Sequence, residues 1–250
     1  MRLLLVNPNT SSSVTDLITA EARRAARSDT ILHSMTAPIG VPYIETDAEA
    51  AIGAYAVLDL IAQHEADHDA AVVAAFGDPG LVAAKQAFGI PVVGLSEAAF
   101  VMAAAQGDSF GIVAIASRMQ AWYRRAIDQN QMGARFRGFR FLSPPLAEIA
   151  TVQQDRADDL ISLGASLVAD TGAGTVIYAG APLAGFVRAN AHRLDFPAID
   201  GTAAAVHLAE ALGNMARQGG SVLRPDRARA KAVTGLSPAL ARALGGDGQV

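Results

Sequence analysis

An internal repeat is the feature that most constrains how this 250-residue chain can fold. Short segments rich in branched apolar residues recur at a spacing of about 105 residues, as in a chain built from two copies of one structural unit. The repeated segments are 4–7 with 112–115, 72–75 with 176–179, and 91–94 with 197–200. The chain is therefore expected to contain two similar units rather than one unit with a long insertion.

Each copy alternates β-branched runs with longer alanine-rich stretches, which is typical of a parallel sheet with crossover helices. Strands are expected near 2–6, 30–35, 69–75, 91–95, 109–115, 137–142, 174–179 and 197–200. Helices are expected at 12–27, 46–65, 80–88, 97–105, 118–130, 151–170, 183–193 and 202–217. The predicted fold is α/β, with two pseudo-symmetric, doubly wound parallel-sheet lobes. Because ligands bind beyond the carboxyl ends of such strands, the site is expected in the cleft between the lobes.

The predicted domains follow from the repeat. Lobe 1 comprises residues 1–105 plus 201–217, and lobe 2 comprises residues 106–200. Residues 218–250 form a C-terminal extension interrupted by glycines and a proline, with one short helix at 237–244. We interpret the extension as an appendage or as an arm of a homo-oligomer, with disorder as the alternative.

Composition narrows the class of partner. The net charge is −4, and the 20 Lys and Arg residues are scattered, which argues against nucleic acid as a partner. No apolar run is long enough for a membrane span or a signal peptide, so no membrane partner and a cytoplasmic location are expected. The chain has no cysteine, which excludes disulfides and thiolate metal sites.

The loops after the first and third strands carry the polar groups expected at the cleft. In the first loop, Thr10 or Ser11 can cap the following helix, while Asn9 can hydrogen-bond a substrate carbonyl or carboxylate. The segment Phe-Gly-Asp-Pro-Gly at 76–80 predicts a tight turn whose backbone N–H groups can bind an anion. Its Asp78 can be either a helix cap or an acid–base group.

These loops resemble those of the hydantoin racemase branch of the aspartate/glutamate racemase superfamily. Segments 40–45, 93–98 and 198–200 match the same branch, and the resemblance covers roughly residues 1–215. The resemblance implies a small-molecule substrate, no cofactor, and two cysteines, one in each lobe, that move a proton on opposite faces of a carbon. The first cysteine position is Ala75 here, and the second is Gly180, or Ala181 with a one-residue gap.

Because alanine and glycine cannot bind a proton, two-cysteine racemisation is excluded. We therefore predict hydrolysis or elimination of a small hydantoin-like, thiohydantoin or ureido acid, for example desulfhydration at ring C2. Glu45 and Asp78 are the predicted catalytic residues, although Glu45 can also be a first-turn glutamate that favours the helix dipole. The predicted substrate-binding residues are Asn9, Thr10, Tyr43, Ala75, Phe76, Gly77, Ser117, Tyr178, Gly180 and Ala181.

Three alternatives stay open at this point. The first is a racemase or decarboxylase type of proton transfer without thiols, and the second is a non-catalytic protein that binds small molecules. The third is a metal-dependent hydrolase centred on His64 and His68, two histidines four apart beside a glutamate. That segment lies at the amino edge of the predicted sheet, away from the cleft, so no metal is assigned to the site. Residues 122–125 are interpreted as a helix with a buried aromatic edge and exposed arginines.

Overall fold

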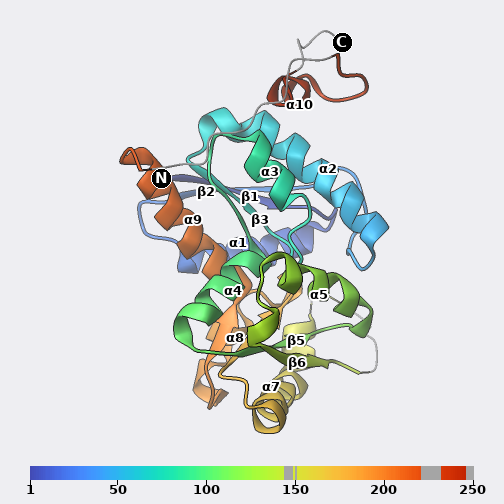
Figure 1. Ribbon diagram of the computed structural model, residues 1–250, viewed down its shortest axis with the longest axis vertical. Helices are drawn as coiled ribbons and strands as arrows, with labels where there is room; N and C mark the ends of the chain where they lie inside the picture. The colour runs from blue at the N-terminus through green and yellow to red at the C-terminus, as the bar shows by residue number, and fades with distance from the viewer. Residues whose placement is uncertain (144–148, 150, 221–231, 246–250) are drawn as a thin grey trace.

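The protein folds into two lobes, each built on a four-stranded parallel sheet (Figure 1). The computed structural model describes residues 1–143, 149, 151–220 and 232–245. In lobe 1 the strand order is β2-β1-β3-β4, with β1 at Arg2–Asn7, β2 at Ile31–Thr36, β3 at Ala70–Val73 and β4 at Val92–Gly94. In lobe 2 the order is β6-β5-β7-β8, with β5 at Phe110–Ala114, β6 at Phe136–Phe141, β7 at Thr175–Ala179 and β8 at Ala198–Asp200. The predicted fold class is confirmed.

Helices cover both faces of each sheet, which explains why the central strands are almost continuously apolar. The helices before the second sheet are α1 (Ser12–Ala25), α2 (Asp47–His64), α3 (Leu81–Ala87) and α4 (Leu95–Gln106). They are followed by α5 (Gln120–Gln129), α6 (Val152–Asp155), α7 (Ala157–Thr171), α8 (Phe186–Ala189), α9 (Gly201–Arg217) and α10 (Pro238–Ala243). Within the described ranges, no helix has the length and apolar character needed to cross a membrane.

Two predicted helices differ from the structure. The helix predicted at 183–193 is wrong: this region contains two 3₁₀ turns and the four-residue α8. Gly185 adopts a left-handed backbone with φ +85°, which prevents a continuous helix from passing through it. The helix predicted at 151–170 is divided into α6 and α7 at Arg156, whose φ of −122° and ψ of 24° are not helical.

The strand registers relate the two lobes residue by residue. In lobe 1 Leu4 pairs with Ala71, which pairs with Val92; in lobe 2 Gly111 pairs with Val176, which pairs with Ala198. Ala71 and Val176 are therefore equivalent, and counting four residues further along each chain segment gives Ala75 and Gly180. The two positions at which the resemblance implies a cysteine are thus equivalent in the fold.

The two lobes share one apolar core on one side of their junction. A single cluster of buried residues includes Leu5 from lobe 1, Phe100 from α4 and Ile112 from lobe 2. Helix α9 packs against α1 and α4, and Figure 1 shows α4 and α9 together on one side of the junction. At the far end of lobe 1, α10 packs against α2, where Leu240 is buried and Ser237 hydrogen-bonds Asp59.

Candidate functional site

A narrow pocket lies between the lobes, at the carboxyl ends of their strands. Its lining residues come from both lobes: Asn9, Tyr43, Ile44, Ala75, Phe76, Met119, Trp122, Tyr123, Gly180, Ala181 and Pro182. The pocket has a volume of about 20 Å³, which is enough for a water molecule but not for a ring. The equivalent positions Ala75 and Gly180 therefore line the same narrow space, which must widen before a ring can enter it.

The side chain of Asn9 is held so that it can act as a hydrogen-bond donor in this pocket. Its Oδ1 accepts hydrogen bonds from Asn7 Nδ2 and from the Ser11 backbone N–H, both at 2.9 Å. The helix cap itself is Ser11, whose hydroxyl accepts from the Val14 N–H. Because the oxygen of Asn9 is occupied, its amide NH₂ group is the part of the side chain that can bind a ligand carbonyl.

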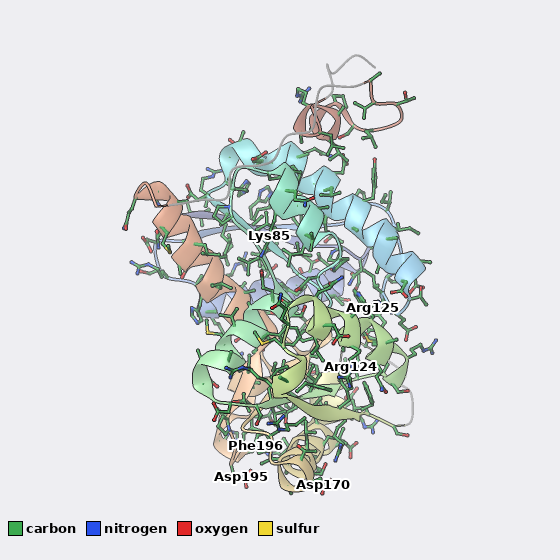
Figure 2. All side chains as sticks on the ribbon, viewed as in Figure 1. Lys85, Arg124, Arg125, Asp170, Asp195 and Phe196 are labelled. Atoms are coloured by element: carbon green, nitrogen blue, oxygen red, sulfur yellow. The ribbon has the colours of Figure 1, made fainter. Side chains whose placement is uncertain are left out.

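Alternate residues of the segment 43–47 contact lobe 2, and we call this segment the clasp. The Tyr43 hydroxyl donates to Met119 Sδ at 3.0 Å, and Glu45 Oε1 lies 3.2 Å from Arg118 Nε. Asp47 forms an ion pair with Arg125, which lies on α5 (Figure 2). Since Tyr43 and Ile44 line the pocket, the clasp joins the two lobes at the edge of the pocket.

Glu45 does not have the role of a first-turn glutamate. Thr46 is the N-cap of α2 and Glu49 completes a capping box, so Asp47 and Glu49 are the acidic residues of the first turn. The Glu45 side chain instead lines a second cavity, which also includes Tyr43, Ser117 and Arg118. Helix capping therefore leaves this carboxylate available to a ligand.

Asp78 is a buried carboxylate in the loop between β3 and α3. Its Oδ1 accepts from the Ser96 N–H at 2.9 Å, and its Oδ2 accepts from the Glu97 N–H at 2.8 Å and from the Ser96 hydroxyl at 2.5 Å. Burial raises the pKa of Asp78 to about 6, although these hydrogen bonds act in the opposite direction. Both oxygens hold the N-terminus of α4, so proton transfer by Asp78 would require these bonds to break. A catalytic role for Asp78 stays a prediction.

The tyrosines of the pocket are hydrogen-bond donors. Burial, and then the nearby charge of Glu45, raises the pKa of Tyr43 far above its usual value. Burial also raises the pKa of Tyr123, whose hydroxyl lies 3.6 Å from Met119 Sδ. Neither phenol is ionised near neutral pH, so neither can replace a thiolate as a base.

Several residues that were expected to bind substrate do not line the pocket between the lobes. Tyr178 does not contribute to the pocket: its hydroxyl donates to the Leu160 carbonyl oxygen inside lobe 2, because its strand position faces α7. The Thr10 backbone N–H bonds the Val41 carbonyl oxygen and so fixes the start of the loop that leads to the clasp. Gly77 packs against Trp122, and a Cβ added there would overlap the indole ring. Ser117 lines the second cavity rather than the pocket between the lobes.

Five residues that line the pocket are absent from the predicted site, namely Ile44, Met119, Trp122, Tyr123 and Pro182. The sequence pattern indicates only a buried aromatic edge for Trp122 and Tyr123, and both side chains are buried. The repeat contains a signal that could have found this region. Counting five residues on from Leu4 and from Gly111 gives Asn9 and Ala116, so the segment after Ala116 is equivalent to the loop after Asn9.

His64 and His68 lie at the amino edge of the lobe 1 sheet, together with His33. His68 Nδ1 lies 2.7 Å from the His64 carbonyl oxygen, and its Nε2 lies 3.2 Å from His33 Nδ1. None of these residues lines the pocket between the lobes. Across the described part of the chain, no group of three or more His, Asp or Glu residues is arranged to hold a metal ion.

Comparisons with known proteins give a consistent result. The family model described as Asp/Glu/hydantoin racemase matches residues 3–209. A hydantoin racemase of Paenarthrobacter aurescens is 32% identical over 216 residues, which cover 85% of this chain and 91% of the relative. An allantoin racemase structure from Klebsiella pneumoniae has a TM-score of 0.87 and 28% identity, covering 96% of this chain and 98% of that chain. An allantoin racemase from Pseudomonas fluorescens has a TM-score of 0.84 and 25% identity, covering 94% and 100%.

Proposed function

This chain belongs to the Asp/Glu/hydantoin racemase family, and we propose that it catalyses racemase-type proton transfer on a small hydantoin-like ring without thiols. The hydrolysis or elimination predicted from the sequence is wrong, because the similar proteins are hydantoin and allantoin racemases. The observation that supports the proposal is the pocket between the lobes. It retains equivalent positions from both lobes, Ala75 and Gly180, together with the donor amide of Asn9.

Proton transfer at such a ring needs a base and a group that stabilises negative charge. The bond that breaks is the C–H bond of the ring carbon next to a carbonyl, and its electron pair moves onto the carbonyl oxygen. In our proposal the Asn9 amide donates a hydrogen bond to that oxygen. Glu45 accepts the proton, since it is the carboxylate next to Tyr43 that is not used for helix capping.

The resulting planar ion can be protonated on either face. In our proposal a water molecule protonates the face opposite Glu45, and Glu45 releases its proton to solvent, so each turnover can invert the carbon. Glu45 is the only protein base in this scheme, so racemisation is expected to be slower than with one thiol in each lobe. The amide of Asn9 and the phenols of Tyr43 and Tyr123 bind and orient the ring.

The test follows exchange and inversion separately. Enantiopure hydantoins and allantoin are incubated with the protein in D₂O. Loss of the ring C–H signal is recorded by NMR, and optical rotation is recorded in parallel. We expect protein-dependent loss of both signals, and a reduction of about 10²–10⁴-fold in Glu45→Gln, the usual contribution of a general base. The matched control is Glu65→Gln, because Glu65 bonds the Gly89 N–H away from the pocket. Exchange no faster than in buffer for every ring would overturn the proposal and favour a non-catalytic binding protein.

A further inference from the structure

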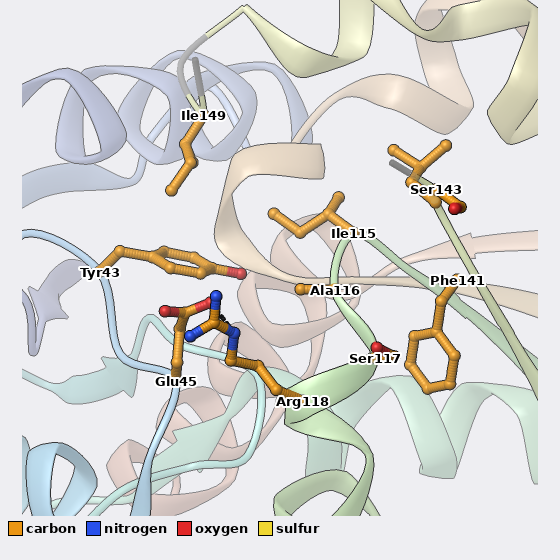
Figure 3. A pocket seen from close by; sticks show the side chains of 10 residues that line it. Tyr43, Glu45, Ile115, Ala116, Ser117, Arg118, Phe141, Ser143 and Ile149 are labelled. Carbon is orange, nitrogen blue, oxygen red and sulfur yellow. Dashed lines mark ion pairs between the residues drawn. The ribbon is translucent and has the colours of Figure 1, made fainter. Parts of the chain in front are cut away.

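A cavity of about 450 Å³ adjoins the pocket between the lobes, and Tyr43 belongs to both. Its walls are polar and apolar in nearly equal parts, and the apolar part includes Ile115, Phe141, Leu142 and Ile149. Figure 3 shows the polar groups of this cavity, with the Arg118 guanidinium beside the Glu45 carboxylate and below the Tyr43 ring. A ring held between the lobes would therefore direct a substituent into a cavity that offers both apolar contacts and this ion pair.

This ion pair can exchange its partner. The side chain of Arg118 is 66% exposed and that of Glu45 is 27% exposed, and they meet through Nε and Oε1 at 3.2 Å. In the described part of the chain, the two terminal guanidinium nitrogens of Arg118 form no hydrogen bond to another protein group. A guanidinium presents a fork of N–H donors that matches a carboxylate in two-point geometry. The present contact with Glu45 uses only part of that capacity.

We propose that this cavity binds a carboxylate-bearing substituent of the ring, which pairs with Arg118 and displaces Glu45. The inference rests on the proposed function, because it assumes that the ring lies in the pocket between the lobes. It also explains how Glu45 becomes a base. While Glu45 is paired with Arg118 its Oε1 is occupied, and an arriving carboxylate frees that oxygen for proton transfer.

The opposite charge on the substituent fits the site less well. A cationic group would pair with Glu45 and stabilise its ionised form, so it would weaken the base that the reaction needs. It would also lie close to Arg118, which stays positively charged at every relevant pH. A neutral substituent would gain the apolar contacts but leave the ion pair in place.

The test measures equilibrium binding, without turnover, of two ligands that differ only in charge. Hydantoin-5-acetic acid and its primary amide have nearly the same size, and calorimetry can give both dissociation constants. We expect the wild-type protein to bind the acid at least tenfold more tightly than the amide, as for a charged hydrogen bond. Arg118→Gln should remove this preference. The matched control Arg125→Gln should keep it, since Arg125 pairs with Asp47 in the same clasp but does not line the cavity.

Glu45→Gln gives a second, independent readout. Removing the competing carboxylate should tighten binding of the acid several-fold while leaving the amide nearly unchanged. Equal affinities of the two ligands for the wild-type protein, or a preference unchanged by Arg118→Gln, would overturn the inference. Selective binding of the acid without any proton exchange would overturn the proposed function alone. Proton exchange without a preference for the acid would overturn this inference alone.

Discussion

Each lobe has a buried carboxylate that caps a helix, but the residue that carries it stands at a different position in each lobe. In lobe 2, Asp200 is the N-cap of α9, and its Oδ1 accepts from the N–H groups of Thr202 and Ala203. In lobe 1 the equivalent residue is Gly94, because it pairs with Val73 as Asp200 pairs with Tyr178. The carboxylate that caps α4 is that of Asp78, and a Cβ added at Gly94 would fall on it.

This difference shows what the fold preserves. Each carboxylate connects a loop of the pocket to the start of a helix. Asp78 belongs to the loop that follows Ala75. Asp200 Oδ2 accepts from the N–H of Gly185, in the loop that follows Gly180, at 2.5 Å. Burial raises the pKa of Asp200 to about 6, as it does for Asp78. The loops are therefore fixed by interactions that do not depend on the residues at Ala75 and Gly180. That independence explains how the frame of the pocket can persist without thiols.

The largest expected effect comes from placing the lobe 2 arrangement in lobe 1. Gly94→Asp alone adds a second carboxyl group where Asp78 already lies, and we expect it to lower the free energy of unfolding by about 4 kcal/mol or more. Asp78→Gly combined with Gly94→Asp should recover most of that loss. Glycine suits the φ of +51° at position 78, and the new aspartate can cap α4 as Asp200 caps α9. Urea unfolding of both variants tests this, and a double variant no more stable than Gly94→Asp would contradict the equivalence of the lobes.

The next prediction concerns pH. A folded-state pKa of about 6 lies above the usual value of 3.8, so the folded protein binds more protons than the unfolded chain between these values. The contribution of each aspartate to stability is therefore greatest at low pH and decreases as the pH rises from 4 to 6. The change is about 3 kcal/mol for each group. In Asp78→Asn and in Asp200→Asn, the part of the pH dependence of stability that comes from the replaced aspartate should be lost. Urea denaturation at pH 4 and pH 7 would measure the free energy of unfolding of each variant. If the difference in free energy of unfolding between a variant and the wild type were the same at pH 4 and pH 7, burial would not raise the pKa of that aspartate.

The third prediction concerns variants with one cysteine introduced in each lobe. Ala75→Cys alone should exchange the ring proton of one enantiomer, and a second cysteine should allow inversion at least a hundredfold faster than in the parent protein, which corresponds to about 2.7 kcal/mol. For lobe 2 we choose Ala181→Cys over Gly180→Cys, because Gly180 has φ +117°, where a side chain strains the backbone. Chiral chromatography of a hydantoin measures the inversion. Equal rates for the single and double variants would show that the lobes do not present these two positions to one ring.

The repeat explains how much could be predicted. The period of apolar runs is a local property of the chain, so it identified the strands, the two lobes and the loops that meet at the pocket. The clasp could not be predicted in the same way, because its contacts with Met119, Arg118 and Arg125 depend on how the lobes meet. The direction of Tyr178 was also missed, since the strand is buried on both faces and its apolar pattern does not distinguish them. The sequence indicates that Asp78 can cap a helix, but it does not indicate that the helix is α4, which lies beyond the next strand.

The smallest expected effect compares the two sides of the junction between the lobes. One side is a shared apolar core, whereas the other is the clasp, whose outer ion pair joins Asp47 and Arg125 with side chains that are 69% and 48% exposed. Exposed ion pairs contribute little, so Arg125→Gln should lower the free energy of unfolding by less than 1 kcal/mol, and 1 M salt should remove the difference. Asp47→Asn added to Arg125→Gln should cause no further loss.

A loss above 2 kcal/mol in Arg125→Gln, or one that persists in high salt, would mean that the clasp carries the stability of the junction. The small value expected here has a functional consequence. The pocket has a volume of only about 20 Å³, so a ring that enters it needs one side of the junction to yield. Separating the apolar side would expose buried core residues to water, at a cost far above that of breaking exposed ion pairs. We therefore expect binding energy to open the clasp and to leave the shared core intact.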